Sequence, residues 1–467
     1  MSNMNPLLIA HNSSYRYPQH GLGLAPTSLT VSRGTAVYVN GASGCGKSTL
    51  ARCLAGFIPH LYRGELSGSV TFAGHALSEM PLWQISEHVG LVLQNPAAQM
   101  LAQTVEEEIV FGLENLGLPR AEIKARLNET MAQFGLTGMR QRNPQTLSGG
   151  EQQKLALAAI MARQPEVLVL DEPFSMLDTT AATELTAALV RLVEQGTAVV
   201  VCEHRGEYIQ ALPSLHTLNL NSSTSPQGLA DAPKPFSTER SEQQLMISKL
   251  SVRLGGKLIL RDMAFNVAGG EVTAVVGKNG SGKTTLLRAL TSLQTFEGSI
   301  QVNGTPPQLG VVFQNPDMQL FNSSVREEIL YRVPNPDMSY YNWLIQAMGL
   351  ANYEDTPPLL LSEGEKKRVA LATILMQRPR HGILLDEPSL GQDIAHKQML
   401  MGILRALAAS GQIVMLTTHD LWLATQADRL LVLADGDLVG DGRPSELVEQ
   451  ADVWQKAGLI LPSRWTS

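Results

Sequence analysis

Five short motifs occur twice in this chain, in the same order in each half, and no other feature constrains the fold as strongly. Such a series does not recur by chance, so we infer two copies of one domain. The copies are Gly41-Ala-Ser-Gly-Cys-Gly-Lys-Ser48 and Gly277-Lys-Asn-Gly-Ser-Gly-Lys-Thr284, Gln94-Asn-Pro and Gln314-Asn-Pro, Leu147-Ser-Gly-Gly-Glu151 and Leu361-Ser-Glu-Gly-Glu365, Leu170-Asp-Glu-Pro173 and Leu385-Asp-Glu-Pro388, and His204 and His419.

The repeats set the expected domain boundaries. We predict a first domain at residues 1–220, a flexible linker at 221–243 that is rich in Ser, Thr, Pro and Gly, and a second domain at 244–467. The offset is 236 residues from Lys47 to Lys283 but 220 from Gln94 to Gln314, so the second copy lacks 16 residues between its first two motifs.

Composition limits the kinds of partner that the chain can bind and indicates the cellular compartment in which it works. The net charge of −7 argues against wrapping nucleic acid, because phosphate binding needs clustered Lys and Arg. Three cysteines without metal-ligand spacing predict a reducing cytosolic compartment. We expect no signal peptide and no apolar run long enough to span a bilayer, so the chain cannot form a membrane pathway by itself.

The two glycine-rich motifs predict phosphate binding. Each follows a β-rich run and opens a helix, so its backbone N–H groups and the helix N-terminus can face a phosphate. We predict that Lys47 and Lys283 reach the β- and γ-phosphates of ATP, and that Ser48 and Thr284 bind Mg²⁺. The other residues predicted to bind the nucleotide here are Gly41, Ser43, Gly44, Cys45, Gly46 and Thr49 in the first loop, and Gly277, Asn279, Gly280, Ser281, Gly282 and Thr285 in the second.

Two Asp-Glu pairs predict the hydrolytic groups. Each pair ends a continuous apolar run, at 167–170 and 383–385, which is typical of a parallel strand buried on both faces. We predict that Asp171 and Asp386 hold Mg²⁺. The adjacent Glu172 and Glu387 would act as general bases or polarise the attacking water.

Histidines and glutamines complete the predicted sites. His204 and His419 each lie 32 residues after the glutamate and follow another apolar run, and this equal spacing favours a contact with the γ-phosphate over a structural role. Gln94 and Gln314 also end apolar runs, and their neutral oxygens suit Mg²⁺ or the attacking water. We predict that both glutamines sense the γ-phosphate.

Together these residues resemble the ATP-binding-cassette family, whose signature motif corresponds to Leu147-Ser-Gly-Gly-Glu151. The resemblance implies an α/β fold of two P-loop NTPase cassettes, each with a RecA-like core, an antiparallel β portion and a helical subdomain that carries the signature. It also implies a head-to-tail pseudo-dimer of the two cassettes. Ser362 and Gly364 would then cap the first ATP site, while Ser148, Gly149 and Gly150 would cap the second, and Asp178 and Asp393 resemble the D-loop aspartates.

The resemblance also makes the two sites unequal. Tyr17 matches the residue that stacks on adenine, whereas Leu254 stands at that position in the second copy and predicts weaker binding there. Glu363 replaces the first signature glycine in the second copy. Both copies keep the glutamate and the histidine, so we expect both to hydrolyse ATP.

Within the family, the Gln-Asn-Pro-x-x-Gln segments resemble the ATPases of energy-coupling-factor (ECF) importers for vitamins, vitamin precursors and transition-metal ions. The segment that follows begins with a capping box at Thr104, and at Ser324 in the second copy. In the family this region receives the coupling helices of a membrane subunit. The partners implied are a T-type coupling protein and a substrate-binding S component, with the chain peripheral on the cytoplasmic face of the membrane.

Two alternatives remain open. A soluble tandem cassette protein that acts on ribosomes has the same number of domains, but usually has a long charged linker and basic surfaces. A fused sugar-importer ATPase typically has a degraded second phosphate loop, whereas residues 277–284 are intact.

Overall fold

The computed structural model describes residues 6–18, 21–42, 44–175, 177, 179–204, 206–220, 243–389 and 394–459. It divides into two compact units, Met1–Thr224 and Ser225–Ser467. This division falls within the segment predicted as a linker, nearly all of which lies outside the described residues. Gln243, its last residue, is buried, and its side-chain amide donates to the carbonyl of Arg380 at 3.1 Å.

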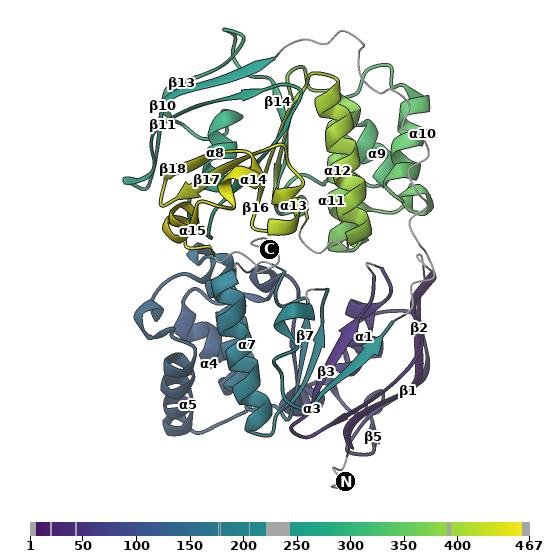
Figure 1. Ribbon diagram of the computed structural model, residues 1–467. Coiled ribbons are helices and arrows are strands. Elements are labelled where there is room, and N and C mark those ends of the chain that lie inside the picture. Colours follow the sequence, from purple (N-terminus) through teal and green to yellow (C-terminus); the bar gives the residue numbers. More distant parts are fainter. Residues whose placement is uncertain are drawn as a thin grey trace. The chain divides into compact units, whose positions relative to one another are not determined.

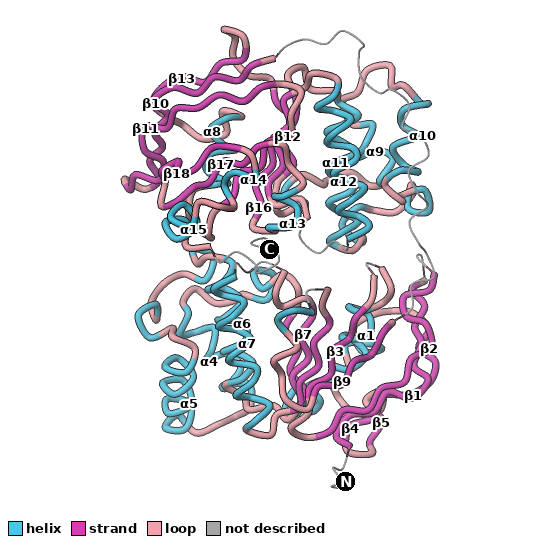
Figure 2. Tube along the Cα trace, viewed as in Figure 1, coloured by secondary structure: helices cyan, strands magenta, loops and turns pink. Residues whose placement is uncertain are grey.

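The first domain is built on a parallel five-stranded sheet, in the order β6-β7-β8-β3-β9. Figure 2 shows this sheet with helices at one side and an antiparallel sheet, ordered β2-β1-β4-β5, at the other. The strands are β1 (Pro6–Tyr17), β2 (Gly21–Ser32), β3 (Ala36–Asn40), β4 (Glu65–Phe72), β5 (His75–Ala76), β6 (Val89–Val92), β7 (Val167–Asp171), β8 (Ala198–Cys202) and β9 (Leu215–Asn219). The helices are α1 (Lys47–Leu54), α2 (Phe57–His60), α3 (Leu82–His88), α4 (Val105–Asn115), α5 (Arg120–Gln133), α6 (Gly149–Met161) and α7 (Thr179–Glu194).

The second domain repeats this plan with a six-stranded sheet, β14-β15-β16-β12-β17-β18, and an antiparallel sheet, β11-β10-β13. Its two sheets and its helical part are labelled in Figure 1. The strands are β10 (Gln244–Leu254), β11 (Lys257–Ala268), β12 (Val272–Val276), β13 (Glu297–Val302), β14 (Leu309–Val312), β15 (Gly382–Asp386), β16 (Ile413–Thr418), β17 (Arg429–Ala434) and β18 (Asp437–Gly442). The helices are α8 (Lys283–Leu290), α9 (Val325–Leu330), α10 (Met338–Ala347), α11 (Glu363–Gln377), α12 (Ile394–Ala409), α13 (Leu421–Thr425), α14 (Pro444–Leu447) and α15 (Ala451–Ala457).

The central strands are largely apolar because both faces of the parallel part of each sheet are covered. In β7, Leu168 and Leu170 pack into the core beneath the helical part, whereas Val167 and Val169 pack into the core shared with α1 and the antiparallel sheet. This two-sided burial fixes where β7 ends, and it therefore fixes the position of the Asp-Glu pair that follows.

The shortening of the second copy removes helices as well as sheet. The first domain carries α2 between α1 and β4, and β5 and α3 between β4 and β6. Within residues 243–389, all of which are described, no helix corresponds to α2 or α3, and β5 is reduced to an isolated bridge between Val302 and Thr305. The 16 missing residues therefore shorten the antiparallel sheet by one short strand and remove the helix that corresponds to α3.

Candidate active sites

The two glycine loops have the local geometry that the sequence predicts. Each joins a buried strand, β3 or β12, to a helix, α1 or α8, and the residue before each helix is a glycine in the left-handed region, Gly46 at φ 102° and Gly282 at φ 106°. A Cβ on Gly46 would lie 2.6 Å from the carbonyl oxygen of Gly23. Only glycine therefore fits, since it tolerates both the positive φ and the close approach.

The lysine of each loop folds back onto the loop. Lys47 Nζ donates to the carbonyls of Gly41 and Ala42 at 2.9 and 3.1 Å, and Lys283 Nζ donates to those of Gly277 and Lys278 at 2.7 and 3.2 Å. Both ammonium groups are thus held over a ring of backbone, where a phosphate group would meet backbone N–H groups and a positive charge together.

The first Asp-Glu pair lies against its glycine loop. Ser48 Oγ donates to Asp171 Oδ1 at 3.0 Å, so two hard oxygen ligands converge at one point, which suits Mg²⁺. Burial, and then the neighbouring charge of Glu172, raise the pKa of Asp171 to about 7. A divalent cation would relieve this accumulation of negative charge.

Glu172 is held between the predicted glutamine and the predicted histidine. The Gln94 amide donates to Glu172 Oε2 at 2.7 Å, and His204 Nε2 lies 3.1 Å from Glu172 Oε1. The same His204 nitrogen lies 2.9 Å from Lys47 Nζ. The structure therefore brings together the first-domain residues predicted from the ends of four separate strands.

The second site has the same members with different contacts. His419 Nδ1 lies 2.9 Å from Glu387 Oε2, which also accepts the His419 backbone N–H at 3.1 Å, and Lys283 Nζ lies 3.9 Å from Glu387 Oε1. Burial alone would raise the pKa of Glu387, but the charge and hydrogen bonds of His419, together with Lys283, lower it to about 2. Gln314 follows β14 at the position equivalent to Gln94.

Both glutamates have a strained backbone. Glu172 and Glu387 each adopt φ 48°, immediately after their strands. A non-glycine residue in the left-handed region costs on the order of 1–3 kcal/mol and persists only where surrounding contacts enforce it. The shared strain indicates that the same sharp bend aims both carboxylates into their sites.

The sequence did not indicate one difference between the two sites that are predicted to hold Mg²⁺. Asp386 pairs in register with Thr417, whose hydroxyl donates to Asp386 Oδ1 at 2.5 Å, whereas Asp171 pairs with Cys202. A thiol is a weak donor, so the first aspartate lacks the bond that the second has. The signal available was the register position, the same end of a neighbouring strand.

The remaining predicted residues lie as follows. Tyr17 is hydrogen-bonded to the first glycine-loop helix, with its hydroxyl 3.2 Å from Thr49 Oγ1 and 3.1 Å from Arg52. Leu254 occupies the equivalent end of β10 and is exposed. Ser43 and the aspartates Asp178 and Asp393 lie outside the described residues. The other predicted residues lie in the two glycine loops or in the first turn of α8; they are Gly44, Cys45, Asn279, Gly280, Ser281, Thr284 and Thr285.

Each signature motif starts a helix as expected. Ser148 caps α6 and Ser362 caps α11, and each serine forms a full capping box with a glutamate, Glu151 or Glu365. Gly149 and Gly150 form the first turn of α6, and Gly364 lies in the first turn of α11. Whether each helix start caps the site of the other domain stays a prediction.

The extra carboxylate in the second signature is neutralised locally. Lys366 Nζ lies 3.3 Å from Glu363 Oε1 and 2.8 Å from Asp317 Oδ1, and these carboxylates, outweighing the effect of burial, raise the pKa of Lys366. In the first domain, the residues at the positions of Glu363 and Lys366 are the uncharged Gly149 and Gln152.

The Gln-Asn-Pro-x-x-Gln segment of the first domain, residues 94–99, is held in place by hydrogen bonds at both ends, and we call it the rigid bridge. Asn95 caps a short 3₁₀ helix that begins with Pro96. The side chain of Gln99 then fastens the segment back onto β6, since it accepts from the N–H of Leu93 at 2.9 Å and donates to the carbonyl of Leu91 at 3.1 Å. Gln319 makes the same pair of bonds in the second domain.

This bridge leads from the active site to a surface groove. The groove encloses about 950 Å³, counting the space open to solvent, and lies between α3, the end of the bridge, α4 and α6. Its apolar members Trp83, Leu101 and Phe111 are 66%, 74% and 50% exposed. Buried Glu108 fixes the rim, because one of its oxygens accepts the N–H groups of Leu101 and Ala102, each at 2.8 Å.

Comparison with known proteins places this geometry in a family. A family model described as ABC transporter matches residues 24–175 and 260–390. The chain belongs to the ABC transporter family. It is a tandem ABC ATPase with two ABC domains on one chain, and it is the ATP-binding subunit of an ABC transporter.

Relatives cover nearly the whole chain. A protein of Bacillus subtilis strain 168, provisionally named as the HMP/thiamine import ATP-binding protein YkoD, is 33% identical over 93% of this chain and 91% of its own length. A protein of Methanosarcina mazei, provisionally named as an ABC transporter ATP-binding protein, is 32% identical over 92% of this chain and 94% of its own length.

Solved structures support the fold. The archaeal ribosome recycling factor aABCE1, solved with the ribosomal stalk protein aP1, aligns over 95% of this chain and 92% of that one with a TM-score of 0.59 and 22% identity. At this identity the likeness confirms the tandem α/β fold alone. No helix in the described parts of the chain has both the length and the apolar character required to cross a membrane.

Proposed function

We propose that this chain is the ATP-hydrolysing energy-coupling subunit of an ECF-type importer for a vitamin, a vitamin precursor or a transition-metal ion. The observation that carries this proposal is the rigid bridge between Gln94 in the first active site and the apolar groove at Leu101. A membrane subunit that docks in the groove would be connected to the hydrolytic glutamate through a single short segment. The printed name of the Bacillus relative supports the same class of substrate.

The groove suits one amphipathic helix of a membrane partner. Three exposed apolar side chains from different elements face this space, which is large enough to hold the side chains of a helix. In this mode of recognition, a groove binds the apolar face of an amphipathic helix. We propose that the partners are a T-type coupling protein and an S component, and that the chain lies on the cytoplasmic face of the membrane.

The two domains would not dock alike. Phe321 and Tyr331 of the second domain stand where Leu101 and Phe111 stand in the first, and their rings meet edge to face at 4.9 Å. With no counterpart of α3, the second domain lacks the side of the groove that carries Trp83. We propose that the first domain provides the deeper groove for the helix of the membrane partner.

In the proposed reaction, each domain uses the same groups. Lys47 or Lys283 would bind the β- and γ-phosphates, and Glu172 or Glu387 would take a proton from the attacking water. The hydroxyl and carboxylate of Ser48 and Asp171, or of Thr284 and Asp386, fit Mg²⁺, which would neutralise phosphate charge. The predicted boundaries, 1–220 and 244–467, and the head-to-tail pseudo-dimer belong to the same proposal.

Two sets of variants test this proposal. Trp83→Glu and Leu101→Glu should release the protein from washed membranes while leaving basal ATP hydrolysis intact, because they alter only the groove. Leu61→Glu is the matched control, since Leu61 is 59% exposed and does not line the groove. Membrane retention by both groove variants would contradict docking there.

Glu172→Gln and Glu387→Gln test the chemistry separately. Each should lower ATP turnover by about 100-fold at its own site, because the attacking water loses its base. If one variant keeps full ATP turnover, the site that carries the substitution does not hydrolyse ATP.

A further inference from the structure

The signature helix of the second domain carries a buried lysine with no counterpart in the first. Lys367 is 6% exposed, and the residue at its position in α6 is Gln153, which is 3% exposed. Lysine is almost never buried to this degree without partners, because removing its charge from water is costly. We therefore looked for the groups in the second domain that stabilise the buried charge of Lys367.

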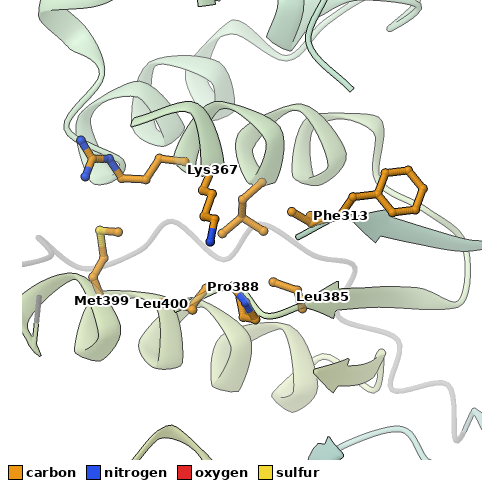
Figure 3. Close-up of a pocket in the computed structure, with 9 residues that line it drawn as sticks. Phe313, Lys367, Leu385, Pro388, Met399 and Leu400 are labelled. Carbon is orange, nitrogen blue, oxygen red and sulfur yellow. The ribbon is translucent and has the colours of Figure 1, made fainter. Parts of the chain in front are cut away.

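Lys367 reaches the hydrolytic end of the central sheet. Its Nζ donates to the backbone carbonyl of Glu387 at 3.3 Å. Figure 3 shows the side chain leaving its helix toward Pro388 and Leu385, within a pocket whose other walls include Phe313 and Leu400. In such apolar surroundings a hydrogen bond from an ammonium group is strengthened, because little water competes for it.

The contact falls on a residue whose backbone is strained. Glu387 holds φ 48° directly after β15, and a strained bend of this kind depends on the contacts that enforce it. In the first domain the counterpart glutamine does not provide this contact, since Gln153 Nε2 is buried without a hydrogen-bond partner among the described residues. The tie between helix and glutamate is therefore a feature of one domain.

We propose that Lys367 is a positioning residue for hydrolysis in the second domain. It holds the backbone at Glu387 so that the carboxylate faces the attacking water, and it joins the start of the signature helix to that glutamate. This inference rests on the proposed role of Glu387 as general base. Since a displacement of about 1 Å at a reacting group can cost up to 100-fold in rate, loss of the tie should slow this site by about tenfold.

The test compares Lys367→Met and Lys367→Gln with the matched variant Gln153→Met in the full-length chain. Both lysine variants should lower kcat for ATP to about half, because one of two sites is slowed about tenfold, while KM changes less than twofold. Gln153→Met should leave kcat unchanged, because its amide nitrogen has no hydrogen-bond partner among the described residues. A purely structural role would instead raise KM and lower the melting temperature.

Two outcomes separate the possible failures. If Glu387→Gln leaves turnover unchanged, the proposed role of that glutamate is wrong. If Glu387→Gln lowers turnover but both lysine variants keep wild-type kcat, only the positioning role is overturned. Should Lys367→Met fail to bind the fluorescent analogue TNP-ATP, Lys367→Gln decides, since a glutamine is accommodated at this position in the first domain.

Discussion

The charge of Glu387 should stabilise the second domain, and its loss should be visible as a dependence of stability on pH. The folded-state pKa of about 2, against an ordinary 4.5, corresponds to about 3 kcal/mol in favour of the folded ionised form. Because the folded pKa is depressed, this contribution is fully present above about pH 4.5 and is lost as the pH falls toward 2. By linkage, about 1 kcal/mol should remain at pH 3.

Replacing Glu387 by Gln should therefore destabilise the protein more at pH 7 than at pH 3. Part of the loss will be offset, since the neighbouring charge of Glu387 helps to raise the pKa of Asp386. We expect a net loss of about 1–3 kcal/mol at pH 7 and less than half of that at pH 3.

Urea unfolding followed by tryptophan fluorescence measures this difference. Four of the five tryptophans lie in residues 244–467, so the signal reports chiefly on the second domain. The exposed Glu449→Gln variant is the control and should follow the wild type at every pH. A destabilisation by Glu387→Gln that is equal at pH 7 and pH 3 would refute the reasoning.

Three further predictions concern single sites. Alkylation of Cys45, whose pKa is raised by burial, should proceed faster as the pH rises and should abolish ATP binding at the first site; unchanged TNP-ATP affinity after complete labelling would refute this. Tyr17→Leu should weaken ATP binding there about tenfold, and Leu254→Tyr should strengthen it at the second site, as measured by titration with TNP-ATP. Asp317→Asn and Lys366→Gln should show a coupling energy of about 0.5–1 kcal/mol in a double-mutant cycle of unfolding, because the carboxylate is partly exposed; additive effects would contradict the ion pair.

The meeting of the predicted site residues in space follows from a simple geometric rule. Buried parallel strands end at one edge of a sheet, so the polar residues that follow them must meet there. Asp171, Gln94 and His204 each follow an apolar run, and the structure brings all three to Glu172 or to the glycine loop. A local signal also succeeded at Thr104, which forms the expected capping box with Glu107.

The contacts that distinguish the two domains could not be predicted, because they depend on pairing between distant segments. The bond from Thr417 to Asp386 depends on strand register, and the tie from Lys367 to Glu387 depends on how a helix packs over the sheet. The groove likewise needs Trp83 to stand opposite α4. Each of these residues looks ordinary in its own stretch of sequence.

The most direct test of the account is to identify what binds this chain in the cell. A tagged protein purified from detergent-solubilised membranes should bring with it a polytopic membrane subunit and a smaller membrane protein that binds the imported substrate. The Trp83→Glu variant, purified in parallel, should lose both. Recovery of ribosomal proteins in place of a polytopic subunit would contradict the importer assignment.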